Sequence, residues 1–562
     1  LDLTDKRFSI ECEQLVVFVV STTGEGEAPD NAKKFWRRIS KPTIASNFLS
    51  TEVGVEPWVY NLIPYILHQL GLYDIQRIPK VLVQKIENKM SDEHSLLNSS
   101  PQLSELTELS LPLVTKKSQQ IVVQKCEEVQ CCDEFFFAKL PVMNSKLFDA
   151  KLMSMRRLNK LCDSDSSIDI KSVFEATMES DTCDFPEYAA GDSFGFICGN
   201  RDEEVSLIMK LLNCDNDANE FYSISCEGIN HLPQYCKLRD YFKYYCELRS
   251  VPMKSCIRCF ADFCESDIQK RRMLELSSRE GADDYAKFVR GGSLNMLDLL
   301  QMFDSCKPTL EAFFSNVPCF VPRYYSVVNT QCEEKKGLFR FAFSVLEFES
   351  RFKREATQLK GVFTGLLESL FKTTDETYSI GDCRSPIASF KVFKRKNLHF
   401  KLPKSPSAPL ILVGPGTGVA PFIAFLEERQ KMKENGQTIG ECWLFFGCRH
   451  SLYDFIYERE LHDFQHSNVL TNLCVCFSRD DSHPQKYVQN LIEENGKAIS
   501  QLILKNNETV VYVCGDLQKL SVNVSTAFTN VIEVEDNLIR EDAVKIIRDL
   551  QSAKRYLQDV WV

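Results

Sequence analysis

The chain has 562 residues, enough for about three or four domains, and its 44% hydrophobic and 26% charged residues are typical of a globular protein. A net charge of −11 argues against nucleic acid and anionic membranes as general partners. No apolar run approaches the roughly 20 residues of a membrane span, and the first residues do not resemble a signal peptide. The 23 cysteines lack a regular framework, so reduced thiols in a cytoplasmic protein are expected.

The N-terminal region predicts one strand and one ligand loop. Residues 15–20 are a continuous apolar run, and the hydroxyl- and glycine-rich loop after it contains Ser21, Thr22, Thr23 and Gly24. Such a loop can hydrogen-bond a phosphate or the edge of a flavin ring, or it can be a plain connection to the next helix. Residues 76–133 are polar and without a sustained period, which predicts a linker.

Alternating patterns return at residue 134. Residues 167–179 and 189–197 are expected to be strands of a barrel. Between about 238 and 317 the pattern becomes helical, which indicates a helical insertion in this domain or, alternatively, an independent helical domain. Cys256 and Cys259 form a CxxC pair there, but the surrounding pattern is that of an amphipathic helix, so no metal site is predicted.

The string Arg323-Tyr324-Tyr325-Ser326 contains the residue types that a flavin dinucleotide requires. Arg323 offers a cation for the pyrophosphate, Tyr325 a flat ring for the isoalloxazine, and Ser326 a hydroxyl for the reactive N5 edge. On one extended strand, Tyr324 would face the other side. By itself, such a string more often consists of core and surface residues. The flavin interpretation is favoured because the string lies about 90 residues before a glycine-rich loop.

That loop follows a buried-strand signal at residues 410–413 and contains Gly414, Gly416, Thr417 and Gly418. Glycines let a backbone approach a ligand closely, and the helix after the loop directs N–H groups at an anion. Further apolar runs at 443–446, 473–477 and 510–513 alternate with helical patterns. This alternation predicts a parallel sheet with helices on both faces, whose ligand site lies beyond the carboxyl ends of the strands.

Side chains at these strand ends favour NADPH over NADH. Arg449 and Cys514 each follow a strand, and no acidic residue follows the second strand closely to hold a ribose 2′-hydroxyl. A cationic, hydroxyl-bearing cluster suited to a 2′-phosphate comprises Ser478, Arg479, Lys486, Tyr487 and Gln489. The alternative is a solvated loop with scattered cations. It is disfavoured because each of these residues falls where a nucleotide site predicts it.

Together these motifs resemble the diflavin reductases, the group that includes cytochrome P450 reductase, and their FAD and NADPH parts resemble the ferredoxin–NADP reductase family. The resemblance implies a multidomain fold of α/β and β-barrel parts. Its domains would be a partial flavodoxin-like FMN domain (1–75), a linker (76–133), an FAD-binding antiparallel β-barrel with a helical insertion (134–404), and a ferredoxin–NADP reductase-like NADPH domain with a parallel sheet (405–562).

The resemblance also implies roles for individual residues. FAD would be contacted by a strand edge at Ala342, Phe343 and Ser344, and by a turn at Gly361, Val362 and Thr364. Trp561 would cover the flavin ring as a lid, and Asp559 would be the acid that assists hydride transfer. Cys514 and Ser326 would flank the nicotinamide C4 and the flavin N5.

The resemblance to an FMN domain is incomplete. Such a domain begins with a strand and a phosphate loop, whereas this chain starts after that point and its first residue is not methionine. A further flavin loop expected between Ser50 and Thr51 is missing, so Ser21 to Gly24 are the FMN-binding residues that remain. A truncated or mis-spliced product is one interpretation, and the sequence leaves FMN binding open.

Within the group, several stretches resemble the members that deliver electrons to methionine synthase: 17–24, 55–58, 281–290, 443–450, 486–489 and 556–561. This resemblance implies electron flow from NADPH to FAD, then FMN, then the cobalamin of methionine synthase, whose cob(II)alamin would be reactivated. The alternatives are another diflavin reductase (cytochrome P450 reductase-like or NADPH-dependent diflavin oxidoreductase), an FAD-only reductase, and a non-catalytic binding protein.

Overall fold

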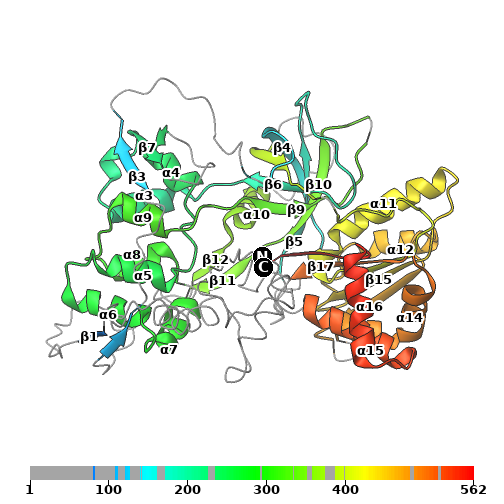
Figure 1. Ribbon diagram of the computed structural model, residues 1–562. Helices are drawn as coiled ribbons and strands as arrows, with labels where there is room; N and C mark the ends of the chain where they lie inside the picture. Colours follow the sequence, from blue (N-terminus) through cyan, green and yellow to red (C-terminus); the bar gives the residue numbers. More distant parts are fainter. Residues whose placement is uncertain are drawn as a thin grey trace, which may run out of the picture. The chain divides into compact units, whose positions relative to one another are not determined.

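The computed structural model describes residues 80–82, 108–111, 121–126, 140, 142–160, 171–225, 235–291, 294–332, 334–350, 357–373, 386–397, 399–480, 486–516 and 520–561. The chain divides into two compact units, residues 1–82 and 83–562. In the first unit, β1 (Lys80–Leu82) is the described element. All other described elements belong to the second unit (Figure 1).

An antiparallel sheet of six strands, in the order β10-β5-β4-β13-β6-β9, is the first large element of the second unit. Its strands are β4 (Phe148–Arg157), β5 (Val173–Glu179), β6 (Ser193–Ile197), β9 (Arg323–Ser326), β10 (Leu338–Ser344) and β13 (Ala388–Lys394). The two edge strands also meet, because Val327, directly after β9, forms an isolated antiparallel bridge with Phe341 of β10. Strands β5 and β6 confirm the two strands predicted from the alternating pattern.

The core of this sheet is rich in phenylalanine. Phe194 and Phe196 alternate with Gly195 on β6, and both rings are buried against rings of β10. The ring centroids of Phe194 and Phe339 lie 4.3 Å apart, and those of Phe196 and Phe341 lie 4.8 Å apart. Because alternate residues of a strand share a face, this packing explains the period of two in the sequence and holds β6 against β10.

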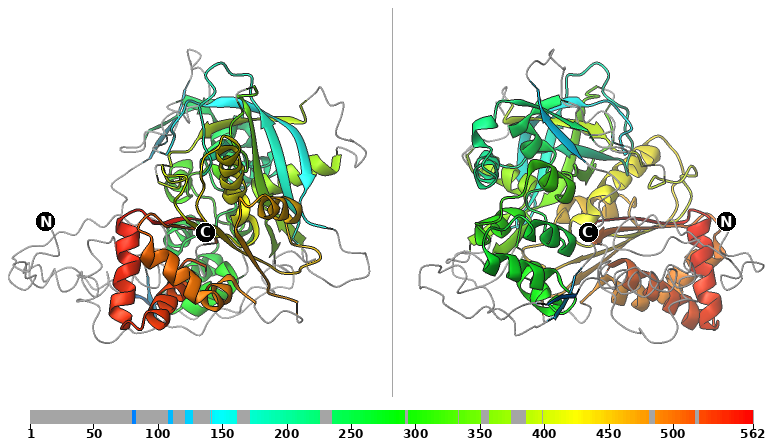
Figure 2. Two further views of the ribbon diagram at one scale, coloured as in Figure 1. Left: turned by 90° about the vertical axis from the view of Figure 1, so that its right-hand side faces the viewer. Right: turned by 60° about the vertical axis from the view of Figure 1, so that its left-hand side comes forward.

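The predicted helical segment is confirmed, and Figures 1 and 2 show its green helices as a group, with the short strands β3 (Val122–Lys125) and β7 (Phe221–Ser225) beside its first and last helices in Figure 1. It comprises α4 (Leu238–Tyr244), α5 (Lys254–Ala261), α6 (Asp267–Ser277), α7 (Ala282–Asp284), the π-helix η5 (Tyr285–Arg290), α8 (Met296–Met302) and α9 (Leu310–Asn316). Cys256 and Cys259 lie on α5, as the helical interpretation predicted. Helix α3 (Asp202–Leu211) and the short η4 (Asp215–Asp217) precede this segment, and α10 (Val362–Thr373) follows it.

Smaller antiparallel pairings connect these parts. One sheet consists of β3 (Val122–Lys125), β7 (Phe221–Ser225) and β8 (Tyr235–Lys237), and another of β11 (Glu347–Ser350) and β12 (Thr357–Lys360). Strand β2 (Glu108–Ser110) lies inside the segment that the sequence predicted to be a linker.

A parallel sheet of five strands follows, in the order β16-β15-β14-β17-β18. Its strands are β14 (Leu410–Val413), β15 (Cys442–Cys448), β16 (Asn472–Phe477), β17 (Val510–Asp516) and β18 (Tyr556–Trp561). The first four confirm the predicted apolar runs, and β18 is an additional strand that those runs did not indicate. Between them lie η6 (Gly416–Val419), α11 (Ala420–Glu434), α12 (Glu458–His466), α13 (Val488–Glu494), α14 (Gly496–Lys505), α15 (Val522–Glu535) and α16 (Arg540–Ser552).

Helices cover both faces of this sheet. Leu410 and Leu412 pack into a core with residues of α11 and α12, whereas Ile411 and Val413 pack into a second core with residues of α13 to α16. All four side chains of β14 are therefore buried, which is why its sequence is a continuous apolar run. Among the described residues, no helix combines the length and apolarity that crossing a membrane requires.

Candidate functional site

The glycine-rich loop leaves the carboxyl end of β14, the central strand of the parallel sheet. Strand β15 lies on one side of β14 and β17 on the other, so the loop stands where the chain changes direction across the sheet. A Cβ atom at Gly418 would lie 2.2 Å from the carbonyl oxygen of Cys514 on β17, so only glycine permits this close packing. Gly416 has a φ of +56°, and a Cβ there would meet no atom within 4 Å. The backbone at Gly416 therefore faces open space, as a loop that receives a ligand requires.

The predicted 2′-phosphate cluster gathers at the ends of β15 and β16. The amide of Arg479 donates to the carbonyl of Arg449 over 2.9 Å, which brings the backbones of the two arginines together. Ser478 is fixed in the same way by a 2.9 Å bond from its amide to the carbonyl of Cys448. The ammonium of Lys486 donates to the carbonyl of Asp480 over 2.7 Å.

Two further predicted residues complete this cluster at the start of α13. Tyr487 is the N-cap of that helix and is 57% exposed, so its ring is accessible to a ligand. Gln489 lies in the first turn of the same helix. The structure thus brings the five predicted residues to one edge of the sheet.

Sequence reasoning missed the residue that ties these loops together. Asp480 accepts a 2.9 Å bond from the amide of Ser451, and its other carboxylate oxygen lies 3.2 Å from Nδ1 of His450. Burial acts to raise the pKa of Asp480, but Ser451 and His450 hold it below its ordinary value. In the sequence, Asp480 could be interpreted only as a loop residue next to Arg479. Its partners His450 and Ser451 lie about 30 positions earlier in the chain, so no local pattern indicates them.

A second cluster forms where β9 of the antiparallel sheet meets β18 of the parallel sheet. The hydroxyl of Ser326 donates to Oδ2 of Asp559 over 3.2 Å. Asp559 pairs in register with Cys514 of β17, so the predicted residues Ser326, Cys514 and Asp559 lie close together. Burial is the largest influence on Asp559 and raises its pKa despite the opposing effects of Arg395 and Ser326. The Cys514 thiol is fully buried, and burial also raises its pKa well above the ordinary value.

Arg395 is the second residue that sequence reasoning missed. Its Nη1 lies 3.9 Å from Oδ1 of Asp559, and its guanidinium lies 4.7 Å from the ring centroid of Tyr324. Arg395 directly follows β13, and its amide donates to the carbonyl of Ser193 over 2.9 Å. No motif surrounds it in the sequence, so only the pairing of β13 with β6 places it at the site.

The Arg323–Ser326 string is an extended strand, as predicted. The rings of Tyr324 and Tyr325 have different neighbours, since Tyr324 contacts Phe393 whereas Tyr325 packs 4.8 Å from Phe341. By alternation Tyr324 shares a side of the strand with Ser326, whereas Tyr325 faces the opposite side. The expectation that Tyr324 alone faces away from the other three residues is therefore wrong. Tyr325 joins the aromatic core, and this burial raises the pKa of its hydroxyl.

Arg323 already has an acidic partner. Its Nη2 donates to Glu247 over 2.7 Å, and its guanidinium lies 4.8 Å from the ring centroid of Phe320. Burial acts to lower the pKa of Arg323, but Glu247 raises it above its ordinary value. A pyrophosphate at Arg323 would therefore share this cation with Glu247.

The predicted FAD edge and turn also have defined positions. Ala342, Phe343 and Ser344 lie at the end of β10. Gly361 directly precedes α10, so Val362 and Thr364 belong to the first turn of that helix. The amide of Gly361 donates to the carbonyl of Leu346 over 2.8 Å, and the hydroxyl of Thr364 accepts from the amide of Leu346 over 3.2 Å.

Two predictions fall partly or wholly outside the described residues. Ser21 to Gly24, the predicted FMN loop, belong to the part of the chain that the structure does not describe. For Trp561 the structure describes the backbone, which pairs with Asp516 at the end of β18, but not the side chain.

The residues present fit two nucleotide cofactors. A glycine loop with open space at Gly416 and a cationic edge at Arg449 and Arg479 suit a phosphorylated dinucleotide. Arg323 and the N-terminus of the 12-residue helix α10 suit a second pyrophosphate. The two sites meet at Ser326 and Asp559, where two bound rings could approach one another.

The chain is similar to known reductases along most of its length. The FAD binding domain family matches residues 140–366, and the oxidoreductase NAD-binding domain family matches residues 412–522. The chain is 29% identical to the methionine synthase reductase of Bos taurus over 659 aligned positions, which cover 97% of this chain and 92% of the bovine protein. It is 34% identical to the Homo sapiens protein of the same name over 412 positions, which cover 70% of this chain and 58% of the human protein.

A more distant relative is the NADPH–cytochrome P450 reductase of Drosophila melanogaster, which is 29% identical over 373 positions that cover 66% of this chain and 50% of the relative. Arg323 and Ser326 lie within the first family match and the glycine loop within the second, whereas Asp559 lies beyond both. The chain is a homologue of the methionine synthase reductases, related to the cytochrome P450 reductases, and is an NADPH-dependent flavin oxidoreductase that uses FAD and NADPH.

Proposed function

We propose that this reductase passes electrons from NADPH through FAD to methionine synthase, for the reductive reactivation of its cob(II)alamin. The acceptor is taken from the name of the relatives. The observation that carries the electron-transfer part is the 3.2 Å contact between Ser326 and Asp559, because it joins the two nucleotide sites. The proposed boundaries are 134–404 for the FAD domain and 405–562 for the NADPH domain. The bridge between Val327 and Phe341 supports a closed barrel in the first of them.

In this proposal the parallel sheet binds NADPH. The backbone of Gly414, Gly416, Thr417 and Gly418 receives the pyrophosphate, since Gly416 faces open space. The 2′-phosphate is held by Ser478, Arg479, Lys486, Tyr487 and Gln489, with Arg449 beside them. A phosphate dianion at this edge would also offset the like charges of the clustered cations.

The antiparallel sheet holds FAD. Arg323 and the first turn of α10, with Gly361, Val362 and Thr364, receive its pyrophosphate. Tyr325 and the β10 edge formed by Ala342, Phe343 and Ser344 would hold the flavin ring. When bound, FAD would supply the redox chemistry, as an acceptor of two electrons from NADPH and a donor of single electrons to the next acceptor.

The chain's own residues prepare the place where the two rings meet. Asp559 can hold a proton at its carboxyl group, because burial favours the neutral form. Ser326 and Cys514 both lie beside Asp559, and the burial of Cys514 excludes water on that side. Trp561, at the end of β18, acts as the lid that must move before nicotinamide enters.

FMN is part of the proposal only if Ser21 to Gly24 and their surroundings form its site. An FAD-only reductase is the second candidate. It is favoured by the bovine alignment, whose 659 positions exceed the 562 residues of this chain. The relative therefore contains segments that this sequence lacks.

A cytoplasmic location, with no nucleic-acid or membrane partner, is proposed from the cysteine usage and the net charge of −11.

The test combines flavin analysis with an acceptor assay. Flavin released from the purified chain is resolved into FAD and FMN by chromatography, and reactivation of cob(II)alamin methionine synthase is followed with NADPH as the electron source. FAD with reactivation supports the proposal. FAD with reduction of artificial acceptors but no reactivation supports the FAD-only reductase, and absence of both flavins after reconstitution contradicts both candidates.

A further inference from the structure

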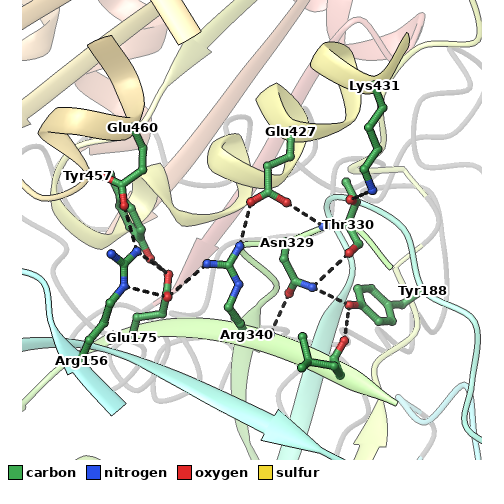
Figure 3. Close-up of polar contacts among 11 residues, drawn as sticks. Arg156, Glu175, Tyr188, Asn329, Thr330, Arg340, Glu427, Lys431, Tyr457 and Glu460 are labelled. Atoms are coloured by element: carbon green, nitrogen blue, oxygen red, sulfur yellow. Dashed lines mark hydrogen bonds and ion pairs between the residues drawn. The ribbon is translucent and has the colours of Figure 1, made fainter. Parts of the chain in front are cut away.

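A buried carboxylate lies at the centre of a polar network away from the site described above (Figure 3). Glu175, on β5, is 3% exposed. Its carboxylate accepts from Nε of Arg156 on β4 over 3.0 Å, and from Nη1 of Arg340 on β10 over 3.2 Å. Strands β4 and β10 flank β5, so the two arginines reach Glu175 from opposite sides.

The other half of the network comes from the NADPH-binding part of the chain. The hydroxyl of Tyr457, which precedes α12, donates to Glu175 over 2.8 Å. Arg156 also donates to Glu460 of α12 over 2.9 Å, and Arg340 donates to Glu427 of α11 over 2.7 Å. We call these six residues the Glu175 clamp: Arg156, Glu175, Arg340, Glu427, Tyr457 and Glu460. Each ion pair within the antiparallel sheet thus extends to a helix of the parallel sheet.

The charges of the Glu175 clamp are satisfied only when both sheets are in place. Burial acts to raise the pKa of Glu175, but Arg156 and Arg340 hold it below the ordinary value, so the carboxylate is charged. If α11 and α12 moved away, Glu175 would lose Tyr457 and the two arginines would lose Glu427 and Glu460. A buried charge with fewer partners is unfavourable, so the network selects one relative placement of the two sheets.

The Glu175 clamp is connected to both cofactor sites through rigid elements. Glu175 pairs in register with Ala342 of β10, a predicted FAD contact. Helix α11 begins at Ala420, directly after the glycine loop, and Glu427 lies about two turns along it. A shift at the clamp is therefore transmitted through one strand pair to the flavin edge and through one helix to the nucleotide loop.

We propose that the Glu175 clamp consists of positioning residues for hydride transfer: it sets how closely the nucleotide loop approaches the flavin edge. This inference rests on the proposed NADPH-to-FAD transfer and is independent of the final electron acceptor. Hydride transfer is sensitive to small displacements, and a misplacement of about 1 Å can lower a rate on the order of 100-fold. Loss of the clamp should therefore slow the transfer without removing either cofactor's own contacts.

The experiment uses Glu175→Gln in the purified holoenzyme, with Glu275→Gln as a matched control. Glu275 is also buried between two arginines, Arg271 at 2.6 Å and Arg272 at 2.8 Å, but it lies on α6 of the helical segment. For both variants we would measure FAD reduction by NADPH in an anaerobic stopped-flow instrument, and the affinity for 2′,5′-ADP by calorimetry. Backbone hydrogen exchange of α11 and α12 gives a readout that is independent of turnover.

Glu175→Gln should lower the rate of FAD reduction about tenfold or more, raise the kinetic isotope effect with deuterated NADPH, and speed hydrogen exchange in α11 and α12. FAD content and 2′,5′-ADP affinity should stay within about twofold of wild type, because neither cofactor loses a contact. Glu275→Gln should leave the rate of FAD reduction within about twofold. A folded Glu175→Gln enzyme with an unchanged rate, or an equal loss in Glu275→Gln, would overturn the proposal.

Tyr457→Phe keeps the proposal testable if Glu175→Gln does not fold, because it removes only one hydroxyl. It should slow FAD reduction about threefold to fivefold, in line with one lost hydrogen bond, and an unchanged rate would overturn the proposal. If wild-type FAD is not reduced by NADPH at all, the proposed function fails. In that case hydrogen exchange tests whether the Glu175 clamp holds α11 and α12 in place. Unchanged hydrogen exchange of these helices in Glu175→Gln would contradict that role.

Discussion

Ser326 and Asp559 are 233 positions apart in the chain, yet Oγ of Ser326 lies 3.2 Å from Oδ2 of Asp559. This contact joins the last residue of β9 to β18 and places the flavin motif beside the C-terminal strand. It is one direct structural link between the proposed FAD and NADPH sites. Its two residues are therefore the first place to test the proposed chemistry.

Asp559→Asn should slow FAD reduction by NADPH about 10- to 100-fold, the range expected when an acid–base group is lost. The amide has nearly the same size and can still accept a hydrogen bond from Ser326, so FAD content should not change. Stopped-flow reduction of the purified variant measures the effect. A variant that is reduced as fast as wild type would remove Asp559 from the catalytic residues.

Asp559 also predicts a pH dependence of stability. Burial raises its pKa above the ordinary value of about 3.9, so the folded state binds this proton more tightly than the unfolded state. The contribution to stability is fully present below the unfolded pKa and is lost as pH rises through the folded pKa. Asp559→Asn should lack that loss, so its free energy of unfolding should increase relative to wild type across this window. Urea titrations at several pH values test this, and parallel pH profiles would contradict it.

Arg479→Ala should raise KM for NADPH about 10- to 100-fold, which corresponds to a charged hydrogen bond of roughly 1.5–3 kcal/mol. The KM for NADH should hardly change, because NADH has no 2′-phosphate. Arg459→Ala is a suitable control, since Arg459 is an exposed residue of α12 whose side chain is 92% accessible. Equal effects of Arg479→Ala on both nucleotides would show that Arg479 does not read the 2′-phosphate.

Two glycines of the same loop should respond differently to alanine. Gly418→Ala places a methyl group against the carbonyl of Cys514, and such overpacking costs about 1–3 kcal/mol of unfolding free energy. Gly416→Ala meets no atom but is disfavoured by its positive φ, at a cost of about 1–2 kcal/mol. Because Gly416 faces the proposed pyrophosphate site, its variant should also weaken 2′,5′-ADP and NADP⁺ binding in calorimetry. Unchanged NADP⁺ affinity in a folded Gly416→Ala protein would contradict the loop assignment.

The two tyrosines of the flavin motif give a paired test. Tyr325 is the proposed partner of the flavin ring, whereas Tyr324 stacks with Arg395 on the Ser326 side. Tyr325→Ala should therefore reduce the FAD retained after gel filtration, with a loss of about 1–3 kcal/mol in binding, as for other ring-stacking contacts. Tyr324→Ala serves as the comparison. If only Tyr324→Ala releases FAD, the ring contact belongs to Tyr324.

Trp561→Ala should weaken the preference for NADPH over NADH, because a lid that nicotinamide must displace would be gone. The ratio of kcat/KM for the two nucleotides measures this preference. Trp561→Phe keeps an aromatic ring and should retain most of it. An unchanged ratio in Trp561→Ala would remove the lid role from Trp561.

The sequence predicted those parts of the fold whose causes are local. Strand β14 is apolar at every position because both its faces are buried. The loop after it could also be predicted, because its glycines are consecutive with that strand and the next helix. Strand β18 was not indicated, because its partner β17 lies about 40 residues away and its own residues mix polar and apolar types. Pairing with a distant strand, more than composition, makes this segment a strand.

The site residues also divide into those with local causes and those that depend on distant partners. The four residues of the flavin motif are consecutive, so their shared strand could be predicted, and residue types marked the cluster around Arg479. Asp480 and Arg395 were missed because each acts through partners that are distant in sequence, His450 and Asp559 respectively. The Glu175 clamp was missed for the same reason, since Glu175 and Tyr457 are 282 positions apart.

Electron transfer from NADPH to FAD is tested most directly by anaerobic mixing of the purified, FAD-loaded chain with a small excess of NADPH, with the flavin absorbance as the readout. We expect rapid bleaching of the FAD absorbance with NADPH and much slower bleaching with NADH. We also expect that the bleached enzyme then reactivates cob(II)alamin methionine synthase. Bound FAD that keeps its absorbance in the presence of NADPH would contradict the proposed transfer from NADPH to FAD.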